Sequence, residues 1–420
     1  MKVKRLKMQS FRGIGDLTLE FDETEPTVLI GINGAGKSSI LDCLAILLSR
    51  FTSSIQHSTS SGRLFREEDI TNGQKETHNE IIVSLDSQEV TWSLTKVHKG
   101  RNKDTNSNLS VITKVSENIK QELYTSHKFN IPIAVYYSTN RAVLDIPLKI
   151  RTKHLFEQID VYENALTGVG SEFRIFFEWF KKQEDLENEL RLEEDNANYR
   201  DRQLESVRQA ISSLIPSFSN LRVRRSPLMR MTVQKQGKEL IVNQLSDGEK
   251  CLLAMVGDLA RRLAIANPGL PDPLKGSGVI LIDEIELHLH PKWQREIISA
   301  LIKTFPNCQF IVTTHSPQVI GDVKPERIYI LEKTDKGVIA KRPESSYGRD
   351  SNYILENVMD DSERRQNIKE RIFELFRLID AGNLEGARQL RQKLAAEIGA
   401  DEPEFVKADI LIRRKEILNR

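Results

Sequence analysis

Thr27-Val28-Leu29-Ile30-Gly31-Ile32-Asn33-Gly34-Ala35-Gly36-Lys37-Ser38 is the stretch that decides the fold of this 420-residue chain. Its four leading apolar residues predict a short strand, the pattern GxxxxGK[ST] follows, and a helical stretch continues from Lys37 to about Arg50. Glycines let backbone N–H groups turn inward around phosphates, because no Cβ stands in the way. Lys37 supplies a charge for the β- and γ-phosphates, and Ser38 supplies a hydroxyl for Mg²⁺. The stretch predicts a phosphate-binding loop, with cofactor-binding candidates Asn33, Gly34, Gly36, Lys37, Ser38 and Ser39.

A second buried strand ends in two carboxylates. Val279-Ile280-Leu281-Ile282 is continuously apolar and is followed by Asp283 and Glu284. Adjacent acids at the end of a buried strand repel each other unless a cation or a reacting water uses them. The pattern predicts that Asp283 joins Ser38 in holding a metal and that Glu284 is a general base.

Two further motifs accompany these strands. Ser246-Asp247-Gly248-Glu249 precedes a helix, where Ser246 can cap the helix and free N–H groups can hold an anion. His315 leaves an apolar strand in Val312-Thr313-Thr314-His315-Ser316-Pro317 and is the candidate contact to a γ-phosphate. We take Ser246 and Gly248 as binding candidates and His315 as a catalytic one.

Composition limits the classes of protein. Lys plus Arg number 61 against 60 Asp plus Glu, so the net charge is only +1, and any nucleic-acid contact must come from a local patch. The three cysteines, Cys43, Cys251 and Cys308, are isolated, which argues against a disulfide framework or a zinc site. No apolar run reaches the ~20 residues of a membrane span, and the N-terminus lacks a signal-peptide core. We expect a soluble, cytoplasmic protein with no membrane contact.

The chain divides into three predicted regions of an α/β protein. Residues 1–50 and 221–345 alternate strands and helices, as a parallel sheet requires. Residues 51–220 contain a polar loop, β runs and a charged helical hairpin, and are expected to form an insertion. Residues 346–420 carry helical periodicity that breaks at Gly382 and Gly399, which predicts an all-α extension. We expect this extension to be a partner-docking region with polar faces that carry Arg364, Arg365, Arg388 and Arg391, although it could merely cover the sheet.

These motifs together resemble a known family. GINGAGKS, LSDGEK, ILIDEIELHLHP and VTTHSP occur in the order of the Walker A, signature, Walker B and H-loop motifs of ABC-type ATPases, which are P-loop NTPases. Ser10-Phe11-Arg12-Gly13-Ile14 and HLHP resemble the RecF/SMC/OLD branch. Tyr136-Tyr137-Ser138-Thr139-Asn140-Arg141, the helix beginning at Phe173 and the tail YGRDSN resemble PtuA-type ATPases of Septu and some retron antiphage systems.

The resemblance implies an ATPase with ATP and Mg²⁺ as cofactors. Two heads would form a homodimer, or a higher oligomer, with each ATP held between one head's loop and the Ser246–Gly248 signature of the other. Arg12 would lie near the phosphates. The sequence departs from the family pattern in having no clear Q-loop glutamine, so Asn140 or another residue takes that place.

The resemblance also implies a separate HNH nuclease, PtuB-like, as the partner that the ATPase controls. DNA or a retron nucleic acid is a further candidate partner. Two other functions stay open. One is a RecF-like repair ATPase that acts on DNA directly. The other is a transporter subunit, but the HLHP turn and the long segment 51–235 argue against it.

Two constellations have competing interpretations. His288-Leu289-His290 could suggest a metal, but no third ligand is near in the sequence and the HLHP turn explains both histidines. A set of basic residues has two equally compatible interpretations, a nucleic-acid surface or solvated strand ends. The set comprises Arg222, Arg224, Arg225, Arg230, Lys96, Lys99, Arg101 and Lys103.

Overall fold

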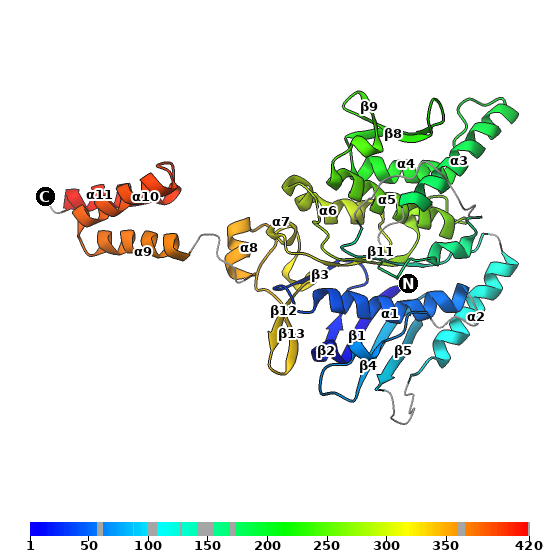
Figure 1. Ribbon diagram of the computed structural model, residues 1–420, viewed down its shortest axis with the longest axis horizontal. Coiled ribbons are helices and arrows are strands. Elements are labelled where there is room, and N and C mark those ends of the chain that lie inside the picture. The colour runs from blue at the N-terminus through cyan, green and yellow to red at the C-terminus, as the bar shows by residue number, and fades with distance from the viewer. Residues whose placement is uncertain are drawn as a thin grey trace. The chain divides into compact units, whose positions relative to one another are not determined.

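A six-stranded sheet forms the centre of the computed structural model (Figure 1), which describes residues 1–56, 62–86, 88–98, 107–126, 128–141, 155–168, 173–359 and 366–418. Its strand order is β13-β12-β3-β11-β10-β6, in which only β13 runs antiparallel to its neighbour. The strands are β3 (Thr27–Ile30), β6 (Ile133–Tyr137), β10 (Gly278–Ile282), β11 (Cys308–Thr313), β12 (Ile328–Thr334) and β13 (Gly337–Lys341). Strands β3, β6, β10 and β11 are buried throughout, which explains why their sequences are mostly apolar and do not alternate with polar residues.

Two antiparallel sheets accompany the central one. The first has the order β2-β1-β4-β5, and the second has the order β7-β8-β9. Their strands are β1 (Lys2–Phe11), β2 (Ile14–Glu20), β4 (Glu76–Leu85), β5 (Gln88–Val97), β7 (Phe218–Arg224), β8 (Arg230–Lys235) and β9 (Lys238–Ile241). Strand β1 alternates buried and exposed residues, as expected for a sheet with one covered face.

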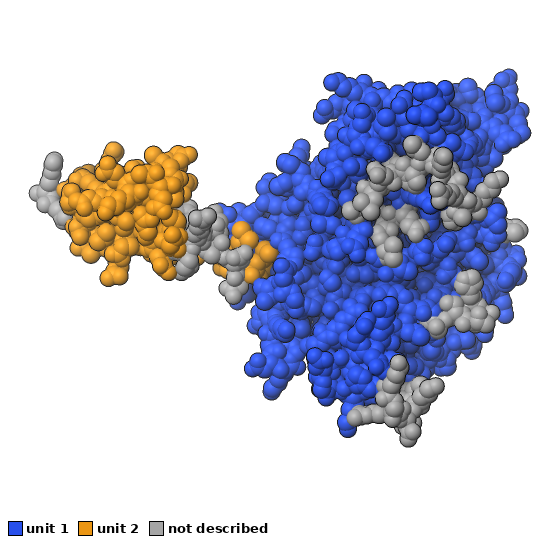
Figure 2. Space-filling view, viewed as in Figure 1, with its two compact units in different colours: residues 1–354 blue, residues 355–420 orange. Residues whose placement is uncertain are grey.

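Helices pack around these sheets in the first of two compact units, Met1–Ile354 (Figure 2). They are α1 (Lys37–Gln56), α2 (Ser110–Thr125), α3 (Phe173–Glu193), α4 (Arg202–Leu214), α5 (Asp247–Ala266), α6 (Pro291–Thr304) and α7 (Pro317–Ile320), with α8 (Ser351–Asn357) at the unit's end. Short 3-10 turns lie at Glu67–Asp69, Gln158–Tyr162, Val242–Gln244, Pro273–Lys275 and Pro325–Arg327. Helix α1 is long and apolar enough to resemble a membrane span, but most of it is buried in this unit.

The second unit, Leu355–Arg420, contains three helices. They are α9 (Gln366–Asp380), α10 (Leu384–Ile398) and α11 (Pro403–Leu418). A small apolar core joins them, and it consists of Ile372, Leu375, Ile379, Ala387, Leu394, Phe405, Ala408 and Ile412. Gly382 and Gly399 have φ values of 78° and 99°, so both glycines end their helices in the left-handed region, as the sequence predicts.

The expected insertion does not stand apart from the ATPase head. In the segment 51–220, β4 pairs with β1 over most of its length, and β6 pairs with β10 at the edge of the central sheet. The division between the two units falls after Ile354 and not after 345. Alternating sequence patterns predict that strands exist, but they do not say which distant strand each one pairs with, so they do not predict where the strands of 51–220 join the sheets.

A buried carboxylate of α5, Asp258, pairs with two arginines of the same helix and joins α5 to β6 of the central sheet through Tyr137. Arg261 and Arg262 donate to the two carboxylate oxygens of Asp258 at 2.6 and 2.8 Å, and the Tyr137 hydroxyl donates to Asp258 at 3.0 Å. Burial alone would raise the pKa of Asp258, but the two guanidinium groups outweigh it and lower that pKa to about 2. The carboxylate is 1% exposed, so its charge depends on these partners.

We expect Asp258→Ala to lower the free energy of unfolding by about 3–5 kcal/mol, because it leaves two guanidinium groups buried without their counter-charge. The stabilisation from the depressed pKa is complete above the pKa of an unfolded aspartate and is lost as the pH falls from about 4 towards 2. Urea unfolding at pH 7 measures the loss. Glu117→Ala, at an exposed position on α2, is the control. Equal midpoints for the two variants would contradict this assignment.

Candidate functional site

The phosphate-binding loop joins β3 to α1, and its backbone needs glycine. Gly31 has φ of 146°, and a Cβ added there would lie 2.5 Å from the carbonyl oxygen of Leu331 on β12. Gly36 has φ of 102° and lies against Ile14 of β2, which leaves a Cβ only 3.3 Å from the Ile14 side chain. Strands β12 and β2 therefore pack closely against the loop, and a larger residue at Gly31 would clash with the β12 backbone and displace the loop.

Lys37 is the first residue of α1 and reaches back across the loop. Its Nζ donates to the carbonyl oxygens of Gly31 at 2.8 Å and Ile32 at 3.1 Å. Burial lowers the pKa of Lys37, while the charges of Asp283 and Glu284 act in the opposite direction. The ammonium thus lies where the loop, the helix N-terminus and the carboxylates at the end of β10 meet.

A cavity of about 200 Å³ opens at this junction. Nine of the residues singled out from the sequence line it: Arg12, Asn33, Gly34, Gly36, Lys37, Ser38, Ser39, Glu284 and His315. Four lining residues were missed by sequence reasoning: Gly13, Ile14, Lys333 and Val338. The last two belong to the β12–β13 hairpin, whose sequence carries no motif. Only the tertiary fold brings them to the loop.

Asp283 and Glu284 have different environments although they are adjacent. Asp283 is 4% exposed, and its Oδ1 accepts a 2.6 Å hydrogen bond from the Thr313 hydroxyl. The same hydroxyl oxygen accepts the backbone N–H of Glu284 at 2.8 Å. Glu284 has φ of 48°, a left-handed conformation that is uncommon outside glycine, and its side chain turns to the cavity. Asp283 stays outside the lining residues.

Arg141 holds this strained turn from the other side. Its guanidinium is 3% exposed and donates to the carbonyl oxygens of Ser138, Asp283 and Glu284. Burial lowers the pKa of Arg141, and the nearby carboxylates oppose that shift. Arg141 belongs to the motif Tyr136–Arg141, whose sequence alone assigns it no role. Its structural role is to clamp the backbone of the turn that presents Glu284.

Glu286 links the end of β10 to the segment that carries His315. One oxygen accepts the backbone N–H of His315 at 2.5 Å, and the other accepts the hydroxyl of Thr314 at 2.8 Å. The imidazole of His315 lines the cavity opposite the phosphate-binding loop. Glu286, two residues after Glu284 in the motif DEIE, therefore positions the segment that carries His315.

Arg12 lines the cavity, but its guanidinium is already paired. It forms 2.7 Å ion pairs with Asp42 on α1 and with Asp69. Burial alone would lower the pKa of Arg12, but these two carboxylates raise it above the usual value. Arg63 also pairs with Asp42, at 2.5 Å. Arg12 is therefore positioned near the loop as expected, within a network of alternating charges that the sequence did not reveal.

Ser246 and Gly248 lie away from this cavity. Ser246 caps α5 by accepting the N–H of Glu249, whose carboxylate accepts the N–H of Ser246 at 3.1 Å in return. Lys235 pairs with Glu249 at 2.6 Å. A Cβ at Gly248 would lie 2.2 Å from the carbonyl oxygen of His288, so the signature turn packs closely on the segment after Glu284. Neither candidate contributes to the cavity of its own chain.

The remaining candidates have local explanations. His290 caps α6 through a 3.3 Å bond from the N–H of Lys292, and His288 has φ of 62°. In the described part of the chain, no group of three His, Cys, Asp or Glu side chains gathers as a metal site. Asn140 is exposed beside the buried Arg141. Lys99, Arg101, Lys103, Arg364 and Arg365 lie outside the described residues.

The residues at the cavity fit a nucleoside triphosphate with Mg²⁺. The donor set includes the Lys37 ammonium and the loop N–H groups at the start of a long helix, which are suited to phosphate oxygens. Ser38 and Asp283 offer the hydroxyl and carboxylate oxygens that Mg²⁺ prefers. A carboxylate on a constrained backbone, Glu284, faces the same space.

Comparison with known proteins agrees with this chemistry. Residues 27–321 match the family described as "AAA domain, putative AbiEii toxin, Type IV TA system". The chain is 29% identical to the "Retron Ec83 probable ATPase" of Escherichia coli, over 99% of this chain and 87% of the relative. It is 30% identical to the "Retron Vc95 probable ATPase" of Vibrio cholerae serotype O1 biovar El Tor, over 86% and 80%. It is 25% identical to a "Septu protein PtuA" of Bacillus thuringiensis, over 93% of each.

Solved structures with a partial likeness include the SMC head domain from Thermotoga maritima, with 16% identity, a TM-score of 0.44 and coverage of 82% of this chain and 100% of that one. The family match spans the phosphate-binding loop, the β10 carboxylates and His315, and the relatives align over nearly the whole chain. This chain therefore belongs to the AAA-domain family described above, and it is an ATPase with retron ATPases and Septu PtuA among its relatives.

Proposed function

We propose that this protein is the ATPase subunit of an antiphage defence complex, in which paired heads control a separate HNH-type effector nuclease in the cytoplasm. The observation that carries the proposal is the single cavity that gathers Lys37, Ser38, Glu284 and His315. It occurs in a chain whose full-length relatives are named retron and Septu ATPases.

Each residue has a proposed part in hydrolysis. ATP bound with Mg²⁺ supplies the phosphoanhydride bond and the cation that neutralises its oxygens. Lys37 would exchange its two carbonyl partners for β- and γ-phosphate oxygens, while Ser38 and Asp283 hold the metal. Glu284 would take the proton of the attacking water, and His315 would contact the γ-phosphate. Arg141 is a positioning residue in this scheme, because it acts through the backbone of Glu284.

We expect Glu284→Gln to bind ATP normally and to hydrolyse it about 10²–10⁴-fold more slowly, since the amide cannot accept the proton. Filter binding of labelled ATP and release of phosphate measure the two effects. Lys37→Ala is the contrasting variant and should lose ATP binding itself. Unchanged turnover in Glu284→Gln would move the base to another residue, and normal ATP affinity in Lys37→Ala would remove the basis of the phosphate-loop assignment.

The position of the signature supports a dimer. Ser246 and Gly248 lie outside the lining of their own chain's cavity, and Gly248 is held against the His288 backbone. A signature that contacts ATP must then come from a second copy. We propose a two-fold pair of identical heads that encloses two nucleotides, with higher oligomers built from such pairs.

Ser246→Arg should bind ATP but should neither pair nor hydrolyse ATP, because the long cation occupies the space of the partner's phosphates. Mixing Ser246→Arg with Lys37→Ala should recover part of the activity, since one hybrid dimer retains one intact composite site. ATPase assays and sizing of the mixture measure this. Ser212→Arg, exposed on α4, is the control for adding an arginine. Full activity of Ser246→Arg as a dilute monomer would exclude the composite site.

The second unit is the proposed docking surface for the nuclease. Arg388 and Arg391 pair inside the unit with Glu416 and Asp409, which removes two arginines that the sequence suggested for docking. Exposed apolar side chains supply an alternative surface: Phe373 on α9 and Val406, Ile410 and Ile417 on α11, each 59–74% exposed. The three on α11 recur at helical spacing on one stripe, as a partner-binding helix requires. DNA or a retron nucleic acid remains a further proposed partner.

We expect the double variant Val406→Glu/Ile410→Glu to keep its ATPase activity and to lose the nuclease, because two carboxylates in an apolar interface leave buried charges without partners. Co-purification of the neighbouring HNH protein and a phage-plating assay measure the loss. Gln392→Glu, exposed on α10, is the control for added negative charge. Retention of the nuclease by the double variant would place docking elsewhere.

A further inference from the structure

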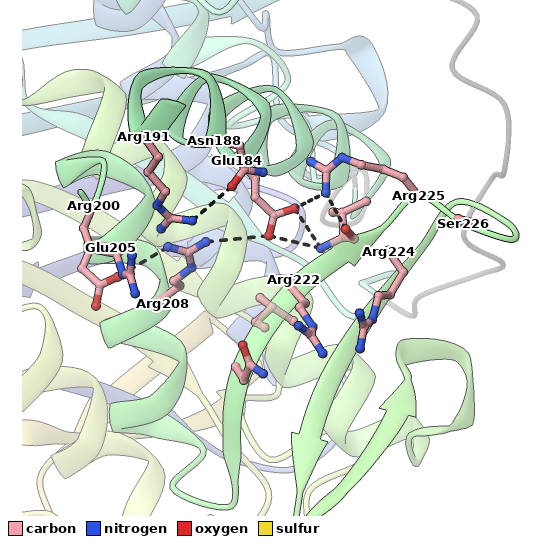
Figure 3. Close-up of a pocket in the computed structure, with 13 residues that line it drawn as sticks. Glu184, Asn188, Arg191, Arg200, Glu205, Arg208, Arg222, Arg224, Arg225 and Ser226 are labelled. Atoms are coloured by element: carbon pink, nitrogen blue, oxygen red, sulfur yellow. Dashed lines mark hydrogen bonds and ion pairs between the residues drawn. The ribbon is translucent and has the colours of Figure 1, made fainter. Parts of the chain in front are cut away.

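A second cavity, larger than the one at the phosphate-binding loop, lies between the helical hairpin and the small three-stranded sheet (Figure 3). Its volume is about 550 Å³, within the range of small-molecule sites. We name it the arginine pocket after its six lining arginines, which are Arg191 on α3, Arg200 before α4, Arg208 on α4, and Arg222, Arg224 and Arg225 on or just after β7. It shares no lining residue with the loop cavity.

Two buried carboxylates of α3 fix half of this pocket. Glu187 is fully buried and accepts hydrogen bonds from Arg191 and Arg208. The Glu184 carboxylate accepts a hydrogen bond from the Arg225 guanidinium at 2.8 Å and another from the backbone N–H of Val223 at 3.1 Å. These three arginines are held by charges that they neutralise, so they form a rigid wall with a structural role.

The β7–β8 face has an excess of positive charge. Arg224 lies directly opposite Arg230 in the strand pairing, and Arg222 follows the same face two residues away. Like charges in opposite positions destabilise a sheet unless an anion intervenes. Glu239 is the carboxylate that serves this face: it pairs with Arg224 at 2.7 and 2.8 Å and meets Arg222 only at 3.4 Å.

Buried donors without acceptors remain on this face. The Nε atoms of Arg222 and Arg230 are buried and have no hydrogen-bond partner among the described residues. A buried donor without an acceptor loses its hydrogen bonds to water and gains none in return, so native proteins retain such groups where a ligand or water uses them. Figure 3 places the Arg222 and Arg224 guanidinium groups side by side at the pocket's edge.

Arg200 adds a further positive charge to the lining of the pocket. Its guanidinium donates to the carbonyl oxygen of Tyr199 at 3.0 Å, and no ion pair ties it to a carboxylate of the described residues. The six arginines are met by five carboxylates, namely Glu184, Asp185, Glu187, Glu205 and Glu239. Arg200 and Arg222 therefore have donors to spare, on opposite walls of one cavity.

We propose that the arginine pocket binds a nucleotide through its phosphate groups, either as a free nucleotide or as the end of a nucleic-acid strand. A guanidinium group can donate two parallel hydrogen bonds to phosphate oxygens. The phosphate groups of a nucleotide would therefore accept hydrogen bonds from Arg222 and Arg200. The volume accommodates a nucleotide, and the amides of Asn188 and Asn220 in the lining offer donors and acceptors for a base. The site is independent of the ATP cavity.

The test uses the full chain carrying Lys37→Ala, so that binding at the phosphate-binding loop does not mask the pocket. Calorimetric titration compares ADP and the pentanucleotide (dT)5 with a 5′-phosphate, which carry a terminal phosphate and are called the phosphate-bearing probes, with (dT)5 that has internucleotide phosphates only. Arg200→Ala/Arg222→Ala is the test variant. Arg377→Ala/Arg413→Ala, which removes two exposed arginines of the second unit, is the matched control. Thermal unfolding checks that each variant folds.

We expect the background protein and the control to bind at least one phosphate-bearing probe, and the test variant to bind it at least tenfold more weakly. Arg200→Lys/Arg222→Lys should fall between them, because lysine keeps the charge and loses the fork. Binding of ADP alone identifies a free nucleotide, and binding of the oligonucleotide only when it is phosphorylated identifies a strand end. No binding of either phosphate-bearing probe, or equal binding by the test variant, would overturn the proposal. If the background protein, which carries Lys37→Ala alone, binds ATP as tightly as the unsubstituted protein, that result would instead count against the proposed function of the phosphate-binding loop.

Discussion

The Thr313 hydroxyl is the contact on which the candidate active site depends. It donates to buried Asp283 and accepts the N–H of Glu284, so one small group on β11 fixes two neighbouring acids of β10 in different directions. Arg141 completes the arrangement from the end of β6 by holding the carbonyl oxygens of the same two residues. Three adjacent strands thus stabilise a left-handed residue that would otherwise relax, and strain of this kind is typical of functional turns.

This arrangement also links the parts of the nucleotide site. Glu286 follows the same turn and accepts the backbone N–H of His315. The carboxylates of the turn oppose the lowering of the Lys37 pKa that burial causes. On the other side, Gly248 packs on the His288 backbone that follows the turn. A change in the turn would therefore move the histidine and the signature together. Such a connection offers a physical route by which the state of a bound nucleotide can reach the surface proposed to pair with a second head.

Two buried carboxylates of the first unit each pair with two guanidinium groups. Asp258 is held by Arg261 and Arg262, Glu187 by Arg191 and Arg208, and each carboxylate answers more than one guanidinium. Such networks fix the packing of helices but leave little charge for a ligand. The arginine pocket departs from this pattern at Arg222 and Arg200, and the loop cavity departs from it at Lys37, whose partners are only backbone carbonyls.

The sequence by itself determined the features that short-range chemistry dictates. The glycine loop, the buried strand before Asp283, the cap at Ser246 and the helix-ending Gly382 and Gly399 each need particular residue types at fixed spacing, so their patterns are specific. Only the tertiary structure decided that residues 51–220 contribute strands to the head, that Arg141 and Glu286 support the active-site turn, and that Lys333 and Val338 line the cavity. These features depend on pairing between segments far apart in the chain. A periodic pattern says that a strand has a buried face, but it does not say which strand will cover that face or what charge will meet its end.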